Sequence, residues 1–463
     1  MILSGCGKFL DVNPKGEVFD ADMYSTGEGF EDALYGIYSE LGNQEYLYRG
    51  YMLWIPEALS RNEICTDYLI GIMSEGDWYY QNNNVRNLLW TACYKAINHV
   101  NNIIVHAEDL SEDEFRYSKL YKGEAYALRA LLHFDLLGIY GAPYWADDSF
   151  KKETVPYVKN YSFDITPFST WEGCYDAIIA DLKEAERLLS ADSELLPPVR
   201  TNSNAGFTDA RITHLNLYAV QALLARVYWM KNDLEAASLY AMKVVDSGKF
   251  SFRPLRAFVQ PDNGTLDLNE TIFGIYSEDF QTPNMRKYVL GTTASTSSFT
   301  LSSDWNLLYN DGSASSGTDY RLSAWFDMGE GKLKKMVNDA WYVSGTSKYT
   351  GNSILGVSVL RIPEMYYILA EYYLDKDQSE ACRYFNAVTT TRGLDPVTSL
   401  TANDLFRERR KEFYGEGLTW YDMKRSGMDI SVTGGKVLDG TLPATYMMPI
   451  PDEEYEGREN LEL

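Results

Sequence analysis

Apolar residues recur at steps of three and four along much of this chain, which is the spacing of one face of an α-helix. The segments 84–107 and 120–140 follow this pattern, and the clearest case is 168–190. Pro143 and Pro156 interrupt the pattern between the last two segments. The apolar stripe of 168–190 consists of Trp171, Tyr175, Ile178, Ile179, Leu182, Ala185, Leu188 and Leu189. The spacing therefore predicts a long amphipathic helix in each segment.

A repeated helix–turn–helix unit is the second feature of the pattern. The segment 211–247 contains two helical stretches with a turn at Asn232-Asp233, and its small Ala residues lie at the spacing of a tetratricopeptide unit. A weaker copy occurs at 363–373 and 380–392. Helix pairs of this kind bury their faces only by stacking on one another. We therefore expect a mainly α fold built on a tetratricopeptide-like helix-pair scaffold.

Two long intervals, 43–83 and 248–359, lack helical stripes, and the second is rich in Gly, Ser, Thr and Asn. A loop interval of this length in a compact protein is usually functional or disordered, and its aromatic residues argue against disorder. We expect a tether at 1–25 and a single domain over 26–463, with the helical scaffold mainly at 26–42, 84–247 and 360–427 and loop-rich excursions at 43–83 and 248–359.

Composition excludes several classes of function. The 463 residues include 42 basic and 66 acidic side chains, and the net charge of −24 makes nucleic acid a poor partner because phosphate is repelled. The chain has four His, no CxxC pair and no HExxH, GxSxG or phosphate-binding glycine motif. We therefore predict no metal site, no cofactor and no catalytic residues. The abundant carboxylates leave a glycoside hydrolase open as an alternative.

The amino end carries a short motif, Leu3-Ser4-Gly5-Cys6, that resembles the cleavage site of bacterial lipoproteins. We predict acylation at Cys6; a chance match is the alternative. Only Ile2 and Leu3 supply apolar residues before it, fewer than a signal peptide needs, so we expect the true start of the protein to differ from the one given. No run approaches the ~20 apolar residues of a spanning helix. A lipid anchor is thus the expected attachment to a membrane.

The segment 405–427, LFRERRKEFYGEGLTWYDMKRSG, alternates acids and bases around a Gly-Glu-Gly. Thr401 and Asp404 are spaced as a capping box for a helix that begins there, and Arg409 with Glu412 forms an i,i+3 pair. The glycines loosen the helix before apolar packing resumes. The charges are either a ligand-binding Arg cluster or a buried structural network, and we favour the network because no catalytic chemistry needs this order.

Taken together, these segments resemble the SusD/RagB family of outer-membrane nutrient-binding lipoproteins. Arg361 to Glu371 is similar to the family's "RxPEmyLixAE" helix, and Phe385 to Gly393 to its "lNxiRxRaG" segment. Glu408 to Arg425 resembles "ERrxELafEGxRwxDLxR", and Met448 to Glu454 resembles the closing "lPIPxxE". Upstream segments resemble further family motifs in the family's order, so the resemblance covers nearly the whole chain. Thr390 and Thr419 depart from it at positions that we interpret as structural.

The resemblance implies a non-catalytic protein that sits at the cell exterior, anchored to the outer membrane by its lipid. Such proteins have a tetratricopeptide-like scaffold with a loop-rich face, and they capture oligosaccharides for a SusC-like TonB-dependent outer-membrane transporter. Members that bind peptides leave a peptide ligand as an alternative. Less favoured readings are a secreted glycoside hydrolase and a scaffold that holds a partner peptide in its groove.

Sugar recognition uses flat aromatic faces together with amide and acid groups for the hydroxyls. The best cluster of such groups is 77–83, just before a predicted helix, where the alternative for Trp78 is packing at the helix end. Local packing is likewise the alternative for part of the second excursion. The candidate ligand-binding residues are Trp78, Tyr79, Tyr80, Gln81 and Asn83 in the first loop, Arg61 and Asp67 nearby, and Trp305, Tyr309, Tyr320 and Trp325 in the second.

Overall fold

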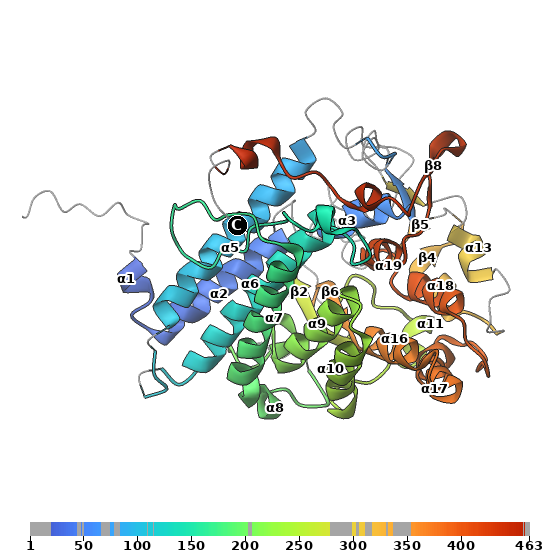
Figure 1. Cartoon of the computed structure of the whole chain (residues 1–463). Coiled ribbons are helices and arrows are strands. Elements are labelled where there is room, and N and C mark those ends of the chain that lie inside the picture. Colours follow the sequence, from blue (N-terminus) through green and yellow to red (C-terminus); the bar gives the residue numbers. More distant parts are fainter. Residues whose placement is uncertain are drawn as a thin grey trace, which may run out of the picture.

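Helices dominate the computed structural model of the chain and lie side by side in a row, from the blue amino-terminal helices to the orange carboxyl-terminal ones (Figure 1). The structure describes residues 20–43, 48, 51–65, 75–77, 84–108, 110–113, 115–201, 206–277, 299–301, 305–310, 317–329, 332–336, 353–456 and 458. The expected mainly α fold is confirmed.

The scaffold consists of antiparallel neighbours that follow one another along the chain. Its amino-terminal part contains α1 (Asp20–Met23), α2 (Gly27–Asn43), α5 (Asn84–Ala107), α6 (Ser118–Tyr140), α7 (Trp171–Leu188), α8 (Asp192–Leu195), α9 (Leu217–Met230) and α10 (Leu234–Asp246). Helix α6 packs between α5 and α7, and α9 packs against α7 and α10. The apolar stripes thus predicted the long helices within a few residues, because each stripe faces a neighbouring helix.

The second helix pair continues this row. Helix α16 (Ile362–Tyr373) packs on α10 and on α17 (Gln378–Thr389), as the weaker repeat predicted. Two further helices follow, α18 (Ala402–Glu412) and α19 (Leu418–Ser426). Thr401 and Asp404 form the expected capping box. The charged segment is therefore two helices rather than one loosened helix.

The break between α18 and α19 has a backbone cause. Gly415 and Gly417 adopt φ angles of 80° and 76°, in the left-handed region that favours glycine. A Cβ on Gly417 would lie 2.8 Å from the carbonyl oxygen of Met52. The turn therefore requires glycine both for its conformation and for its close approach to the preceding α3 (Tyr51–Leu59).

Short strands, short helices and 3₁₀ turns lie between the long helices, many of them in the two intervals without helical stripes. Antiparallel pairs join β2 (Thr271–Tyr276) to β6 (Gly356–Arg361), β1 (Glu63–Cys65) to β3 (Phe299–Leu301), β4 (Phe326–Asp327) to β5 (Lys332–Leu333), and β7 (Ile430–Ser431) to β8 (Val437–Leu438). Short helices are α11 (Arg256–Val259), α13 (Trp305–Asn310) and α14 (Tyr320–Trp325). Single 3₁₀ turns are η2 (Asp148–Phe150), η3 (Leu189–Ala191), η4 (Arg211–Thr213), η6 (Thr390–Arg392), η7 (Thr433–Gly435), η8 (Pro443–Tyr446) and η9 (Asp452–Tyr455).

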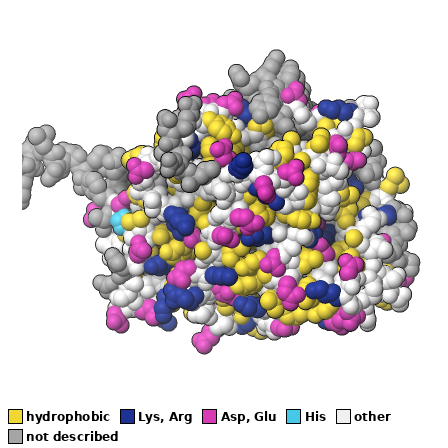
Figure 2. Space-filling model, in the orientation of Figure 1, with side chains coloured by type: hydrophobic (Ala, Val, Ile, Leu, Met, Phe, Trp, Pro, Cys, Tyr) yellow, Lys and Arg dark blue, Asp and Glu magenta, His cyan; other side chains and the backbone are white. Residues whose placement is uncertain are grey.

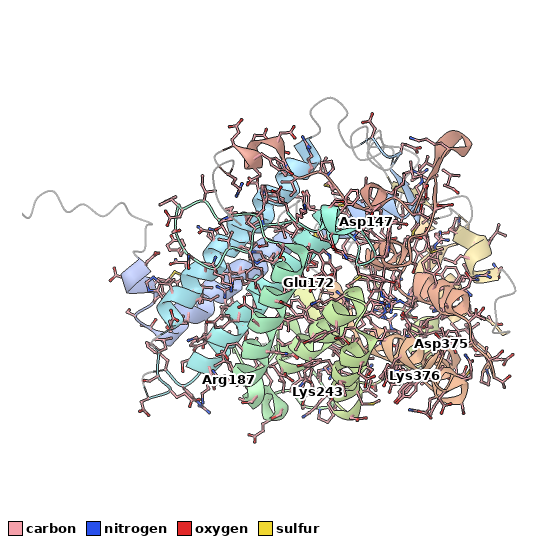
Figure 3. The ribbon with its side chains drawn as sticks, in the orientation of Figure 1. Asp147, Glu172, Arg187, Lys243, Asp375 and Lys376 are labelled. Carbon is pink, nitrogen blue, oxygen red and sulfur yellow. The ribbon has the colours of Figure 1, made fainter. Side chains whose placement is uncertain are left out.

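Two apolar clusters make up the core. The larger one fills the helical scaffold, and the smaller one lies between α13, α14, β4 and the end of α18. Charged side chains of both signs are scattered over the visible surface among hydrophobic and other side chains (Figure 2). Asp147, Glu172, Arg187, Lys243, Asp375 and Lys376 lie exposed at the periphery of the scaffold (Figure 3). Among the described helices, none combines the length and apolarity that crossing a membrane requires.

Candidate functional site

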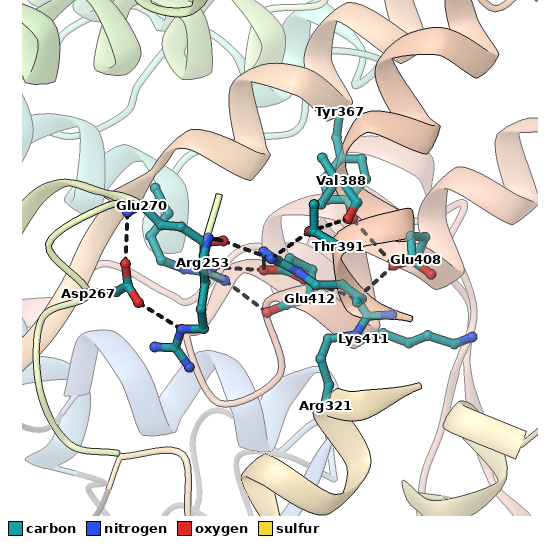
Figure 4. Close-up of polar contacts among 12 residues, drawn as sticks. Arg253, Asp267, Glu270, Arg321, Tyr367, Val388, Thr391, Glu408, Lys411 and Glu412 are labelled. Carbon is teal, nitrogen blue, oxygen red and sulfur yellow. Dashed lines mark hydrogen bonds and ion pairs between the residues drawn. The ribbon is translucent and has the colours of Figure 1, made fainter. Parts of the chain in front are cut away.

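The charged segment places Glu412 at the centre of a buried ionic network (Figure 4). Its Oε1 lies 2.7 Å from Nη1 of Arg361 and 2.8 Å from Nη2 of Arg392, and its Oε2 lies 3.0 Å from Nη1 of Arg321. The side chain is fully buried. Burial alone would raise the pKa of Glu412, but Arg392, Arg361 and Arg321 hold it well below its usual range.

Each of these arginines has further acidic partners. Arg321 lies 2.7 Å from Asp319 and from Glu408, Arg361 reaches Glu270 and Glu416, and Arg392 reaches Glu270 at 2.7 Å. We call the eight residues Asp319, Arg321, Arg361, Arg392, Glu270, Glu408, Glu412 and Glu416 the Glu412 network. Because every one is buried or nearly so and charge-paired, the network ties α14, β6, η6 and α18 together rather than presenting arginines to a ligand.

The expected pair of Arg409 with Glu412 is wrong. Arg409 Nε instead donates to Asp422 Oδ1 at 2.6 Å, in the following helix α19. The chain turns at 413–417, so α19 folds back against α18 and supplies a carboxylate to the face of Arg409. Glu412 lies one turn further along α18 and pairs with Arg321, Arg361 and Arg392 instead.

The candidate aromatic residues of the second excursion belong to the smaller apolar cluster or pack against it. Trp325 is 2% exposed and Tyr309 is 7% exposed, and the Tyr309 hydroxyl donates to the Lys411 carbonyl oxygen at 2.8 Å. Trp305 is half-buried, stacks on Phe326 with ring centroids 4.9 Å apart, and packs against the smaller cluster together with the half-buried Tyr320. These contacts favour the packing alternative for Tyr309 and Trp325, because neither ring presents an open face.

A small polar hollow lies beside Trp325 and the Glu412 network. Lys335, Arg361, Glu416 and Asp267 are among its lining residues, and its volume is ≈ 40 Å³. That is space for one or two water molecules, not for a sugar ring. Burial lowers the pKa of Lys335 to about 8, although Glu416 lies 2.6 Å from its Nζ. The hollow is therefore not the expected ligand site.

Arg61 is the candidate of the first loop that the structure describes. Its Nη1 lies 3.1 Å from Glu75 Oε1, and its own backbone is left-handed with φ 61°. Lys436 Nζ donates to the Glu75 carbonyl oxygen at 3.2 Å, and a Cβ on Gly76 would touch Leu438 of β8. The residues just before Trp78 therefore lie against the β7–β8 hairpin. Asp67, the loop candidates 78–83 and Cys6 lie outside the described residues.

The structure also brings together residues that the sequence reasoning did not single out. Glu57 of α3 accepts from the Gly417 backbone N–H at 2.7 Å and from Asn62 Nδ2 at 3.0 Å. Asn62 Nδ2 also donates to Thr419 Oγ1 at 2.9 Å, and its Oδ1 accepts from Arg410 Nε at 2.7 Å. These buried polar groups link the first loop-rich interval to the turn after α18. Their signal in the sequence is a Glu and an Asn beside the apolar run of α3.

The histidine at the centre of the scaffold has a structural role. His133 of α6 is fully buried, its Nδ1 lies 2.8 Å from the Arg129 carbonyl oxygen, and its Nε2 accepts from the Val158 N–H at 3.0 Å. Burial lowers its pKa to about 3, so the ring is neutral. Within the part of the chain that the structure describes, no three His, Cys, Asp or Glu side chains are grouped to hold a metal ion.

Two family models match the chain. One, described as "Starch-binding associating with outer membrane" and named SusD-like, matches residues 8–229. The other, described as "SusD family", matches residues 306–461. Between them they cover both the helical scaffold and the charged segment with its closing motif.

Individual proteins match over nearly the full length. "SusD-like protein P38" of Formosa agariphila is 24% identical, and the match covers 94% of this chain and 90% of that protein. A solved SusD superfamily protein of Bacteroides thetaiotaomicron has a TM-score of 0.72 at 22% identity and covers 93% of this chain and 98% of its own. A solved SusD-like carbohydrate binding protein of Bacteroides vulgatus has a TM-score of 0.65 at 20% identity, with 89% and 88% covered.

Proposed function

Because this chain belongs to the SusD/RagB family, we propose that it is a cell-surface binding lipoprotein that captures oligosaccharides and passes them to a SusC-like TonB-dependent outer-membrane transporter. The proposal assigns it no bond-making or bond-breaking step. Cys6 would carry the lipid that holds it on the outer membrane, facing the cell exterior.

The observation that carries the proposal is the full-length match to a family with a carbohydrate-binding member, on a scaffold built for rigidity. The Glu412 network joins elements that are far apart in sequence, since Arg321 reaches Glu412 and Arg392 reaches Glu270. A buried network of this kind fixes the loop-rich side without offering a reactive group. Rigid support lowers the entropic cost of binding, which suits capture of a dilute solute.

The ligand face would be the first loop, with Trp78 as its main platform and Tyr79, Tyr80, Gln81 and Asn83 as partners for ring faces and hydroxyls. Arg61 adds a guanidinium at the base of that loop, held by Glu75. Asp67 belongs to the same interval. From the second excursion we keep Trp305 and Tyr320, which are half-buried, as secondary contacts.

Affinity electrophoresis and calorimetry against a panel of soluble polysaccharides and oligosaccharides test this function. We expect retention by at least one glycan class and no release of reducing ends during prolonged incubation. Release of sugar would support the glycoside hydrolase instead. Binding to peptides without binding to any glycan would replace oligosaccharide by peptide as the ligand class.

The transporter partnership has its own test. The full-length lipoprotein, expressed with a SusC-like TonB-dependent transporter from the same organism, should co-purify with that transporter from detergent-solubilised outer membranes. A Cys6→Ser variant should be lost from the membrane fraction when it is expressed alone. Retention of that variant in the membrane at the level of the unmodified protein would contradict the proposed anchor.

A further inference from the structure

A rigid strap between η2 and α7 exposes large apolar side chains in an alternating pattern. Residues 159–165 are all exposed. Phe163 is fully exposed at 109%, Tyr161 is 46% exposed and Ile165 is 49% exposed. A side chain such as Phe163 gains free energy by leaving water, so its full exposure has a cost in the isolated protein.

A buried arginine holds one end of the strap and a partly buried arginine holds the other. Arg129, paired with Asp181 at 2.6 Å, donates from Nη1 to the Lys159 carbonyl oxygen at 3.1 Å. At the other end, Arg458 Nε donates to the Thr166 carbonyl oxygen at 3.0 Å. The apolar side chains are therefore presented by a fixed backbone and not by a loose tail.

The strap lies where the described chain begins. Asn101 of α5 donates to the Val158 carbonyl oxygen at 3.1 Å, and the next residue, Asn102, donates to Asp20 Oδ2 at 3.3 Å. Tyr161 also lies close enough to Tyr24 to influence it. Burial raises the pKa of Tyr24 to about 12, and Asp20 and Tyr161 act in the same direction.

Val105 is a further exposed apolar residue on α5, the helix whose Asn101 holds the strap. It is 52% exposed and follows Asn101 and Asn102 by four and three residues on α5, so it shares their face of the helix. The patch of Tyr161, Phe163, Ile165 and Val105 therefore adjoins the point from which residues 1–19 lead to Cys6.

We propose that this patch rests on the lipid surface to which the chain is anchored and sets the orientation of the protein there. The inference depends on the anchor at Cys6 in the proposed function. A chain from Cys6 to Asp20 spans at most roughly 50 Å when extended, so the lipid on Cys6 lies within that distance of Asp20, which contacts Asn102 beside the strap. Membrane contact removes Phe163 and Ile165 from water, while Tyr161 suits the headgroup level.

The shape of the patch favours a lipid surface over a protein. The exposed apolar side chains of the strap alternate with polar ones: Phe163 is flanked by Ser162 and Asp164, and the Asp164 N–H donates to Ser162 Oγ at 3.2 Å. Stable protein interfaces bury roughly 800 Å² on each partner around packed anchors. A protruding apolar side chain on a polar strap needs a deformable medium that closes around it, which headgroups and acyl chains provide.

Flotation with vesicles tests the proposal on the full chain without its lipid, as the Cys6→Ser protein. The probe is phosphatidylcholine vesicles, with a second set containing phosphatidylglycerol. We expect weak binding to phosphatidylcholine that Phe163→Ala lowers roughly ten-fold or more. Binding to anionic vesicles should be weaker, because the chain carries a net charge of −24. Val199→Ala, at an 81% exposed apolar position elsewhere, is the matched control and should bind as before.

A fluorescent reporter gives a second, independent measurement. Phe163→Trp should show a blue shift and quenching by brominated lipid, whereas Val259→Trp, at a 71% exposed site, should show neither. No binding of the Cys6→Ser protein, equal binding of Phe163→Ala, or a reporter shift that appears only with the transporter overturns the proposal. Glycan retention is measured on the same proteins. If neither the Cys6→Ser protein nor any of its variants retains a glycan, the proposed function is refuted, and the vesicle result is unaffected.

Discussion

Glu57 Oε1 accepts a hydrogen bond of 2.7 Å from the backbone N–H of Gly417, 360 residues further along the chain. Both groups are buried or nearly so, and the bond holds the left-handed turn that separates α18 from α19. Burial raises the pKa of Glu57, with the Asn62 amide and two turn N–H groups acting in the opposite direction. The turn is thus fixed by a carboxyl group from the opposite end of the sequence.

Gly417→Ala should destabilise the protein by about 3 kcal/mol, because it adds left-handed strain and a Cβ contact of 2.8 Å with the Met52 carbonyl oxygen. Denaturant unfolding measures the change. Gly434→Ala is the matched control: it has a similar φ of 77° and nothing within 4 Å of its Cβ, so it should cost only about 1 kcal/mol. Equal losses in the two variants would mean that the contact with α3 is unimportant.

Glu412→Gln should cost about 3–5 kcal/mol of unfolding free energy, since it leaves Arg321, Arg361 and Arg392 buried without their shared carboxylate. Glu380→Gln removes a carboxylate from an exposed pair with Arg383 and should leave the unfolding midpoint unchanged. Unaltered stability in Glu412→Gln would refute the structural role of the Glu412 network.

Asp135 predicts a pH dependence of stability. Burial raises its pKa to about 7, although Tyr48, which donates to its Oδ2, and Arg226 oppose the shift. The folded carboxyl keeps its proton at pH values where the unfolded one has lost it. Its contribution is therefore most favourable below the unfolded pKa of about 3.9 and is lost as pH rises through 7.

Asp135→Asn removes that titration and keeps a polar partner for Tyr48. We expect the unfolding free energy of the variant, relative to the unmodified protein, to rise by about 2–3 kcal/mol between pH 5 and pH 8. Urea unfolding at both pH values measures the difference. A constant difference across this interval would show that Asp135 is already ionised at pH 5.

Trp78→Ala should abolish retention in a glycan-containing gel and leave the melting temperature almost unchanged. The reason is that a platform ring loses its stacking contact with the sugar, and the fold does not depend on it. A large drop in melting temperature would instead mean that Trp78 packs at the helix end.

Trp325→Ala should behave in the opposite way. Trp325 is 2% exposed, and its ring centroid lies 4.0 Å from Lys335 Nζ. Truncation should therefore cost about 3–5 kcal/mol of unfolding free energy. We expect glycan retention to persist at a temperature where the variant is folded. Loss of retention with intact stability would return Trp325 to the set of ligand contacts.

The helical scaffold was predictable because its signal is local. The stripe over 168–190 and the run 84–107 predicted α7 and α5, since each apolar face packs on a neighbour in the row. Helix α3 escaped notice because it is almost uniformly apolar and contains Pro56, so it shows no stripe. Periodicity reports only residues that repeat along one face.

The partners of Glu412 could not be predicted from the sequence for the same reason. The sequence offered Arg409 three residues away, but the arginines that bind Glu412 lie 20, 51 and 91 residues distant. Likewise, the sequence around an aromatic residue in a loop-rich interval does not show whether the ring packs inward, as that of Trp325 does, or faces a ligand. Only the fold separates these cases.

The pairing of Tyr276 with Gly356 brings together the two ends of the interval between them, which makes up most of the second excursion. An interval whose ends already meet can be exchanged for another of different length without displacing the helices on either side. Arg321 lies within that interval and pairs with both Glu412 and Glu408, so an interval without it would leave Glu412 with two of its three arginines and would remove the arginine paired with Glu408. Any replacement of this interval must therefore bring its own arginine.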